Sequence, residues 1–209
     1  MARVRLLASA LGLMLAGPAF AGDRLAPLPP VQHSEAELSA LRHQFPGATG
    51  ALAFRLLAAH NRERAAVGHP ALVWDADLAA SAASYGPALA SLRHLIHSPR
   101  ETRPGQRENL AMARHGTLSP EQLVDMWSRE KRMLQPGVFP AVSNTGRWED
   151  VAHYTQMVWP TTTRVGCAIF SADWDYLICR YSPPGNIDGK PVFASAPVQL
   201  AQASGHGGN

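Results

Sequence analysis

Two segments distinguish this 209-residue sequence: Val151-Ala-His-Tyr-Thr-Gln-Met-Val-Trp159 and Tyr176-Leu-Ile-Cys-Arg-Tyr-Ser-Pro-Pro-Gly-Asn-Ile187. The first places His153 among aromatic, β-branched and amide residues just before Trp159. The two cysteines of the chain, Cys167 and Cys179, lie in apolar runs that flank the turn-forming residues 171–175. This pattern predicts two strands joined in a hairpin. A disulfide between the strands is the favoured state after export, and two free buried thiols are the alternative.

The first 21 residues have the pattern of a secretory signal peptide. A basic start at Arg3 and Arg5 precedes an apolar run over residues 6–16, and Ala19-Phe20-Ala21 is a small-x-small cleavage site. The apolar run is shorter than the stretch of about 20 residues that a membrane-spanning helix needs, and no later segment qualifies. The sequence therefore predicts cleavage after Ala21, a secreted or periplasmic protein, and no transmembrane segment.

The charge balance argues against a nucleic-acid partner. The 19 basic residues include Arg3 and Arg5, so 17 remain against 16 acidic residues after cleavage. A nucleic-acid-binding domain usually shows a basic stripe or a strongly basic composition, and neither is present. The remaining chain of about 185 residues is long enough for one domain with its own core.

Composition divides the exported chain into a lead, a domain and a tail. Residues 22–47 are rich in proline, and one short helix is expected from Ser34, because its spacing to Glu37 resembles a capping box. Residues 48–193 carry the periodic patterns of a folded domain. Residues 194–209 are rich in Ala, Gln, Gly and His, which predicts a flexible tail.

Two helices are expected at the start of the domain. Residues 51–67 predict the first, with five residues on one face: Phe54, Leu57, Ala58, Asn61 and Ala65. Gly68 is expected to end it. Residues 75–92 predict a second, alanine-rich helix that either continues through Gly86-Pro87 or breaks there. A polar loop is expected over residues 98–107.

The later part of the domain mixes helices with strands. Ser119 is predicted to cap a helix that has Pro120 first and Gln122 third and reaches about Leu134. The expected elements after it are a loop over 135–147, a short helix over 151–158, and strands near 163–171 and 176–181. Helices followed by a paired sheet predict an α+β fold, in which helices cover a small antiparallel sheet.

Glu130 is the residue that least fits its position. On the helix that begins at Ser119, the spacing predicts an inward face of Leu123, Met126, Trp127, Glu130 and Leu134. An unpaired buried charge is costly, so a carboxylate on this face requires a partner or a water-filled cleft. The alternative is that Glu130 lies at the edge of the face and pairs with Lys131 or Arg129.

The two segments quoted first resemble the "G-H-Y-T-Q-x-V-W" and "C-N-Y-x-P-x-G-N" boxes of the CAP superfamily, which includes cysteine-rich secretory, antigen-five and pathogenesis-related proteins. The chain is similar to a bacterial-type secreted member. The resemblance implies a three-layer α-β-α sandwich with a small antiparallel sheet. It suggests the fold more strongly than any reaction.

The family places two histidines and two glutamates in a central cleft, and four residues match them. They are His97 in Ile96-His-Ser-Pro99, Glu108 in Arg107-Glu-Asn-Leu-Ala111, Glu130 three residues after Trp127, and His153. Two departures stand beside them, because Ala152 and Arg107 occupy positions that are usually glycine. If the family's backbone has a positive φ there, the backbone of this chain must adjust. Arg107 also places a cation beside Glu108, which would lower its proton affinity.

These four residues are the candidates for any catalytic or metal-binding role. Two imidazoles and a carboxylate, with the other glutamate as a base, resemble a zinc site, and zinc or another divalent metal is expected to bind weakly. The same residues would also serve as a hydrogen-bond network without a reaction. The sequence has no H-E-x-x-H or G-x-S-x-G motif, and it leaves open whether the protein is an enzyme.

Three functions follow, of which a binding module is preferred. Family members are associated with sterols and fatty acids, and residues 133–148 offer apolar side chains without helical spacing: Leu134, Val138, Phe139, Val142 and Trp148. A lipid-like or sterol-like ligand is therefore expected. The alternatives are a non-catalytic interaction protein and a metal-dependent hydrolase of extracellular substrates. Asn61, Asn109 and Asn186 are expected to bond backbone groups, and Tyr154 and Trp159 to lie in the core.

Overall fold

The computed structural model describes residues 47–193. The helices are α2 (Gly47–Ala66), α3 (Ala76–Leu92), α4 (Pro120–Ser128) and α5 (Ala152–Met157), with the 3₁₀ turns η1 (Arg100–Thr102), η2 (Arg129–Met133) and η3 (Trp148–Val151). The strands are β1 (Val73–Trp74), β2 (Arg107–Arg114), β3 (Arg164–Ser171) and β4 (Trp174–Ser182). The predicted signal peptide, nearly all of the lead and the tail lie outside the described residues. None of the described helices is long and apolar enough to cross a membrane.

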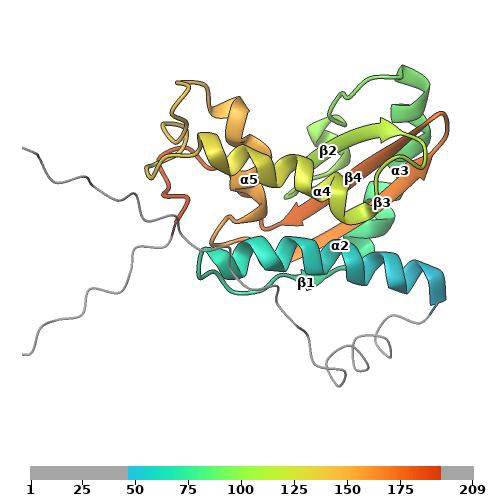
Figure 1. The fold of residues 1–209 in the computed structure, drawn as a ribbon, viewed down its shortest axis with the longest axis horizontal. Coiled ribbons are helices and arrows are strands. Elements are labelled where there is room, and N and C mark those ends of the chain that lie inside the picture. Colours follow the sequence, from blue (N-terminus) through green and yellow to red (C-terminus); the bar gives the residue numbers. More distant parts are fainter. Residues whose placement is uncertain (1–46, 194–209) are drawn as a thin grey trace, which may run out of the picture. The chain divides into compact units, whose positions relative to one another are not determined.

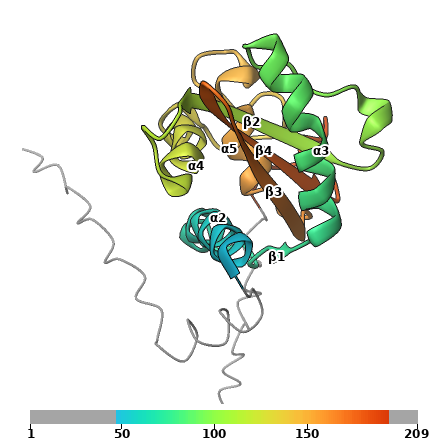
Figure 2. The ribbon, with the colours of Figure 1, turned by 90° about the vertical axis from the view of Figure 1, so that its right-hand side faces the viewer.

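A four-stranded sheet in the order β1-β3-β4-β2 forms the middle layer (Figure 1). β2, β4 and β3 pair in antiparallel fashion, and the two-residue β1 adds a parallel pairing to β3. α3 packs on one face of the sheet, while α2, α4 and α5 pack on the other (Figure 2). The expected α+β fold, a three-layer α-β-α sandwich with a small and mainly antiparallel sheet, is confirmed.

β4 is the central strand of the core. Its side chains alternate between the two helical layers, with Tyr176 and Ile178 against α3 and Leu177, Cys179 and Tyr181 on the opposite face. All five are buried. Burying one large apolar side chain contributes roughly 1.5–3 kcal/mol, so this strand joins the two layers energetically as well as in space.

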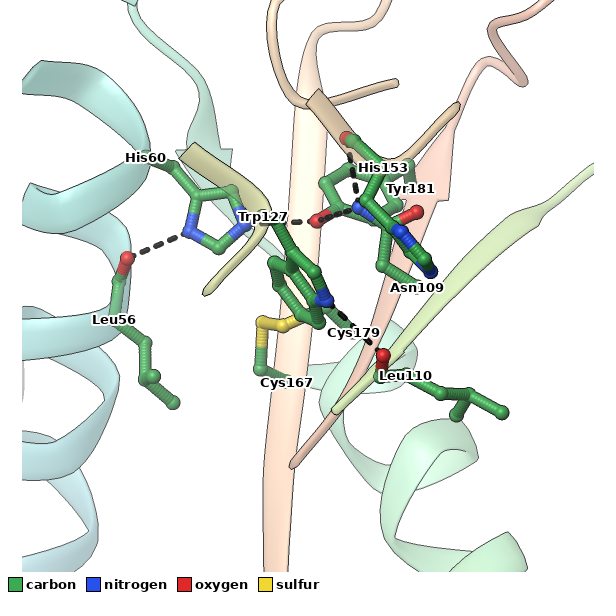
Figure 3. The surroundings of a disulfide bond; sticks show 9 residues. All are labelled: Leu56, His60, Asn109, Leu110, Trp127, His153, Cys167, Cys179 and Tyr181. Atoms are coloured by element: carbon green, nitrogen blue, oxygen red, sulfur yellow. Dashed lines mark hydrogen bonds between the residues drawn. A yellow bond between two sulfur atoms is a disulfide. The ribbon is translucent and has the colours of Figure 1, made fainter. Parts of the chain in front are cut away.

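The predicted hairpin and its disulfide are both present. Cys167 of β3 lies directly opposite Cys179 of β4, with their Cα atoms 4.1 Å apart, and the two are disulfide-bonded (Figure 3). The strands meet at the turn that residues 171–175 predict. The alternative of two free thiols is therefore wrong.

β2 is not predicted from the sequence pattern, which suggests only a loop ending at its first residue. The strand pairs with β4 along its whole length. Leu110 faces α3 and Ala111 faces the opposite layer, but the polar residues 107–109 at its start conceal this alternation. β1 has only two residues, which is too short for a period to show.

The buried face of α2 differs from the predicted one. Ala65, placed on the inner face by its spacing, is exposed. The side chains that are buried include three polar ones, His60, Glu63 and Arg64. Each has hydrogen-bond or ion-pair partners inside the protein, so burial does not leave it unsatisfied. The prediction is therefore right for Leu57, which is buried, and wrong for Ala65; it misses the buried polar residues because their partners lie elsewhere in the fold.

Several predicted helix ends agree with the structure, although α2 begins at Gly47 and not at the predicted residue 51. Gly68 follows α2 with a φ of +71°, which suits a glycine after a helix. Asp75 caps α3, which continues through Pro87 without the break that was one of two expectations. Ser119 and Gln122 form the reciprocal capping box of α4, and η2 extends that helix to Met133.

Arg64 fastens α2 to the end of α5. Its guanidinium donates hydrogen bonds to four backbone carbonyls, those of Pro70, Met157, Trp159 and Thr162, at 2.6–3.1 Å. The side chain is almost fully buried, and burial lowers its pKa to about 10, so it stays cationic at neutral pH. A cation among the carbonyls that follow a helix also interacts favourably with the helix dipole.

We expect Arg64→Lys to lower the free energy of unfolding by about 2 kcal/mol, and Arg64→Met by 3 kcal/mol or more. An ammonium cannot reproduce the planar fork that binds several carbonyls, and methionine leaves them all without a donor. Urea unfolding followed by circular dichroism measures both. Arg62→Lys, which changes an exposed arginine of the same helix, is the control and should cost about 0.5 kcal/mol. Equal losses at positions 62 and 64 would contradict the assignment.

Candidate functional site

A cavity of about 620 Å³, called the central cavity below, brings together residues from distant parts of the chain. Its walls come from residues 97–109, residues 139–148, α5 and residues 186–188. His97, Glu108 and His153 all line it. Three of the four expected site residues therefore face one cavity, and the fourth, Glu130, contacts His153.

His97 and Glu108 form the first of two histidine–glutamate pairs. His97 Nδ1 donates to Glu108 Oε1 at 2.9 Å. The same oxygen accepts the backbone N–H of Ser98 at 2.9 Å, and Oε2 accepts the Ser98 hydroxyl at 2.8 Å. One buried carboxylate of β2 thus holds both the ring of His97 and the backbone that follows it.

His153 and Glu130 form the second pair in the same manner. His153 Nδ1 donates to Glu130 Oε1 at 2.6 Å. Oε2 accepts the backbone N–H groups of His153 and Tyr154, both at 3.0 Å. These N–H groups belong to the first turn of α5, which has no carbonyl partners for them, so Glu130 caps α5 from another element. The prediction that Glu130 meets a partner is confirmed, whereas Lys131, the alternative partner, pairs with Glu63.

In both pairs the carboxylate fixes which nitrogen of the ring carries the proton. Because Nδ1 of each histidine donates to a carboxylate, Nε2 of the neutral ring is the nitrogen with a lone pair. Within residues 47–193, neither Nε2 makes a hydrogen bond or ion pair. The rings also keep some exposure, 54% for the side chain of His97 and 32% for that of His153. Trp127 stacks on the His153 ring and restrains it further.

Glu108 is charged although it is buried. Burial raises the pKa of this carboxyl, but hydrogen bonds from His97 and Ser98 and the nearby Arg103 outweigh burial and hold it below its ordinary value. Arg180 lies 3.3 Å from Oε2, and Arg103 lies 3.9 Å from Oε1. These two arginines, rather than Arg107, are the cations paired with Glu108.

Neither of the two residues that replace glycine distorts the backbone. Ala152 has φ −64° and ψ −36°, an ordinary helical conformation. Arg107 begins β2 and is absent from the described residues with positive φ. Its guanidinium instead donates to the carbonyls of Gly185 and Asn186 at 3.0 and 3.3 Å.

A buried hydrogen-bond path joins α2 to His153 (Figure 3). His60 Nδ1 donates to the carbonyl of Leu56 at 2.7 Å, so its Nε2 accepts the hydroxyl of Tyr181 at 2.8 Å. The Tyr181 oxygen accepts Asn109 Nδ2, which also donates to the carbonyl of His153. Burial is the main cause that lowers the pKa of His60 to about 4, and burial raises the pKa of Tyr181 well above its ordinary value. His60 is therefore neutral at pH 7.

The four candidate site residues do not form a preformed metal centre with closely spaced ligand atoms. Within the described residues, the group whose ligand atoms lie within 4.8 Å of one another is His60, Cys167 and Cys179. Its sulfurs form the disulfide and both nitrogens of His60 are hydrogen-bonded, so this group offers no lone pair to a cation. No three of the residues His97, Glu108, Glu130 and His153 have ligand atoms that all lie within this limit of one another.

The loop over residues 133–148, expected to contact a ligand, contains both buried and exposed apolar side chains. Phe139 and Val142 are buried, and the Phe139 ring contacts the rings of Trp148 and Trp159. Val138 and Trp148 are exposed by 48% and 41%, and Trp148 lines the central cavity. Phe139 also lines the cavity, so a buried and an exposed aromatic side chain of this loop both face it.

The expected amide roles are visible in the hydrogen bonds. Asn61 exchanges two hydrogen bonds with the backbone of Leu72. Asn186 donates to the carbonyl of Ala152 and accepts from Thr155, so it fastens residues 186–188 to α5. Tyr154 and Trp159 lie in the core as expected.

Three residues that matter for the site are not predicted from the sequence. Ser98 and Arg103 hold Glu108, and Tyr181 links His60 to Asn109. Only Ser98 has a local signal, because it follows His97 directly. The others reach the site across the fold.

Comparisons with known proteins agree with the fold. The model of the cysteine-rich secretory protein family, CAP, matches residues 57–181. Pathogenesis-related protein 1C of Nicotiana tabacum is 39% identical over 140 residues, which cover 66% of this chain and 78% of that protein. A pathogenesis-related protein of PR-1 type from Sambucus nigra is 35% identical over 138 residues, with shares of 65% and 78%.

Solved structures of two proteins have a similar fold. Na-ASP-1 superposes with a TM-score of 0.61 at 26% identity, and the match covers 72% of this chain but only 43% of that one. NaASP2, solved with Zn2+, superposes with a TM-score of 0.59 at 24% identity and covers 69% of this chain and 86% of that one.

Replacing Glu130 by glutamine is expected to lower the free energy of unfolding by about 2 kcal/mol. The amide keeps one acceptor but turns an N–H₂ group toward the donors of α5 or His153, which leaves a buried donor unsatisfied. Thermal and urea unfolding measure the loss. Glu149→Gln, an exposed glutamate on η3, should change stability by about 0.5 kcal/mol or less. The capping role is refuted when the two variants are equally stable.

Because His60 is buried, we expect the free energy of unfolding to depend on pH between pH 6.5 and 4. Below its ordinary pKa of 6.5 the unfolded chain binds a proton at His60, whereas the folded chain does so only near pH 4. The free energy of unfolding therefore falls as pH falls through this window, by roughly 3 kcal/mol for His60 alone. Urea unfolding at pH 7, 5.5 and 4 tests this against His60→Asn, whose stability should fall less steeply. If the free energy of unfolding of His60→Asn fell with pH as steeply as that of the wild type, burial of His60 would not be the cause and the prediction would be wrong.

Proposed function

The chain belongs to the cysteine-rich secretory protein (CAP) family, and we propose that it is an exported binding protein whose central cavity holds a small ligand beside a divalent cation at His97 and His153. One observation carries the proposal. Each imidazole is held through Nδ1 by a carboxylate, which leaves the Nε2 lone pair available at the cavity. Metal-binding histidines usually have their other nitrogen hydrogen-bonded in this way.

The donor set fits a metal such as zinc in which the glutamates do not coordinate directly. Glu108 and Glu130 already accept three hydrogen bonds each, so their role is to orient the rings and raise their basicity. His97 and His153 would supply two nitrogen ligands, and solvent or the bound molecule would supply the rest. When bound, the cation would attract an oxygen atom of the ligand. The expected affinity is modest, because no three of the four residues have closely spaced ligand atoms.

The hydrogen bonds that the two glutamates already accept favour binding over hydrolysis. A general base must have a free oxygen within reach of the water that it activates. Both oxygens of Glu108 and of Glu130 already accept hydrogen bonds from the protein, which leaves each carboxylate about one lone pair for a water. The hydrolase alternative, in which one of these glutamates acts as the base, therefore has less support than a binding role.

Apolar side chains at the cavity support a ligand with an apolar part. Trp148 and Ile187 line the cavity and are 41% and 40% exposed. Exposed apolar residues at a concave site are typical of ligand contacts. A lipid-like molecule fits this surface better than a fully polar one.

Export is consistent with the disulfide between Cys167 and Cys179. Such bonds persist in oxidising compartments and are rare in the cytosol. The family description, which names secretory proteins, also supports export.

We expect zinc to bind the wild-type protein, and His97→Ala and His153→Ala to weaken binding at least tenfold. Each variant removes one of two nitrogen ligands, and lower pH should weaken wild-type binding because protons compete for the rings. Isothermal titration of protein without a histidine tag measures the affinity. His94→Ala, an exposed histidine away from the cavity, is the matched control and should bind as the wild type does. Equal zinc affinity in all four proteins would rule out a metal site at this pair.

A further inference from the structure

Three arginines line one part of the central cavity: Arg100, Arg103 and Arg107. Arg100 belongs to η1, Arg103 follows it directly, and Arg107 begins β2. None of them is needed for the two histidine–glutamate pairs except Arg103, which lies near Glu108.

The three arginines differ in how far the protein satisfies them. Arg103 is buried and donates to Ser98 and to the carbonyl of Gln106. Arg107 uses Nε and one terminal nitrogen on two carbonyls, so its other terminal nitrogen has no hydrogen bond within the described part of the chain. Arg100 is exposed, and its side chain makes no hydrogen bond or ion pair with residues 47–193. Arg100 and Arg107 therefore have donors to offer to a bound molecule.

The charges around the cavity are not balanced. The carboxylates that line it are Glu108 and Asp188, and Glu108 is already paired with Arg103 and Arg180. Only Asp188 remains to offset Arg100 and Arg107. Burial lowers the pKa of Arg107, and repulsion from Arg100 and Arg103 lowers it further. An anion placed there would relieve this repulsion.

The apolar and cationic parts of the cavity meet in one short segment. Ile187 lies between Asn186, whose carbonyl accepts a hydrogen bond from Arg107, and Asp188. The cavity thus offers an apolar surface and a cationic surface within the length of one small molecule.

We propose that the central cavity selects an anionic amphiphile, whose carboxylate or phosphate group lies against Arg100 and Arg107 and whose apolar part lies against Trp148 and Ile187. This rests on the proposed binding function and adds the charge of the ligand to it. Planar guanidinium groups suit both anions, because each accepts paired hydrogen bonds from the arginine fork. Arg107 stands where the family boxes have glycine, so this selectivity is a property of the present chain.

The test uses three probes with the same eight-carbon chain: octanoate, octyl phosphate and 1-octanol. Isothermal titration compares the wild type with Arg100→Gln and Arg107→Met, and Arg114→Gln at the far end of β2 is the control. The Arg100 side chain has no hydrogen bond or ion pair within residues 47–193, so its replacement keeps the fold even if that of Arg107 does not. Trp148→Asp tests the apolar surface separately.

The two anions should bind the wild type about tenfold more tightly than octanol, and each cavity variant should lose about tenfold for the anions without a change for octanol. Raising the salt concentration should weaken the anions alone. Whichever anion binds more tightly identifies the preferred group. Octanol binding as tightly as the anions, or anion binding unchanged in Arg100→Gln, overturns the proposal and leaves the binding function intact. If no probe binds, or Trp148→Asp binds all three as the wild type does, the apolar ligand site fails as well, while the zinc titration still decides the metal site.

Discussion

The hydrogen bonds of Glu130 to the first turn of α5 set the position of His153, and the rest of the cavity depends on that position. α5 has six residues, far fewer than an isolated helix needs to be stable in water. Glu130 binds the unpaired N–H groups at its start, and Arg64 binds carbonyls at its end. A negative group at the N-terminus and a positive one at the C-terminus also match the helix dipole. Two side chains from other elements therefore hold this helix, and with it one of the two histidines.

Glu108 does for His97 what Glu130 does for His153. Each carboxylate binds the ring of its histidine and the backbone beside it, so ring and main chain cannot move independently. The charge of Glu108 is affordable in the interior because Arg103 and Arg180 accompany it, whereas a buried carboxylate without such partners is strongly destabilising. The result is a pair of histidines, 56 positions apart in the sequence, with defined tautomers at one cavity.

Local patterns in the sequence predict the parts of this arrangement that depend on neighbours along the chain. The cap at Ser119, the end of α2 at Gly68 and the hairpin between Cys167 and Cys179 each have a short-range signal. The misfit of Glu130 on an apolar face also indicates a partner, although the pattern does not show that the partner is the backbone of α5.

Features that arise from distant contacts are not predictable in this way. Arg64 has the pattern of a surface residue, yet it binds a carbonyl 95 residues away, so the predicted face of α2 omits it. β2 is concealed because its first residues are polar and serve the cavity. In the sequence, Arg107 stands out only because it replaces a glycine of the family boxes. Its place beside Arg100 and Arg103 at the central cavity follows from the fold. The family boxes bring the four site residues to attention, but only the structure shows that each carboxylate accepts three hydrogen bonds from the protein.

The central claim is that both histidines carry their proton on Nδ1 and present a lone pair on Nε2. Nitrogen-15 NMR of the ring nitrogens of His97 and His153 at pH 8, without added metal, measures this directly. The account predicts a protonated Nδ1 and an unprotonated Nε2 in both residues, with the Nε2 resonances shifting when zinc is added. Protonation on Nε2 in either ring would contradict it, because the carboxylate behind that ring could not then hold it as described.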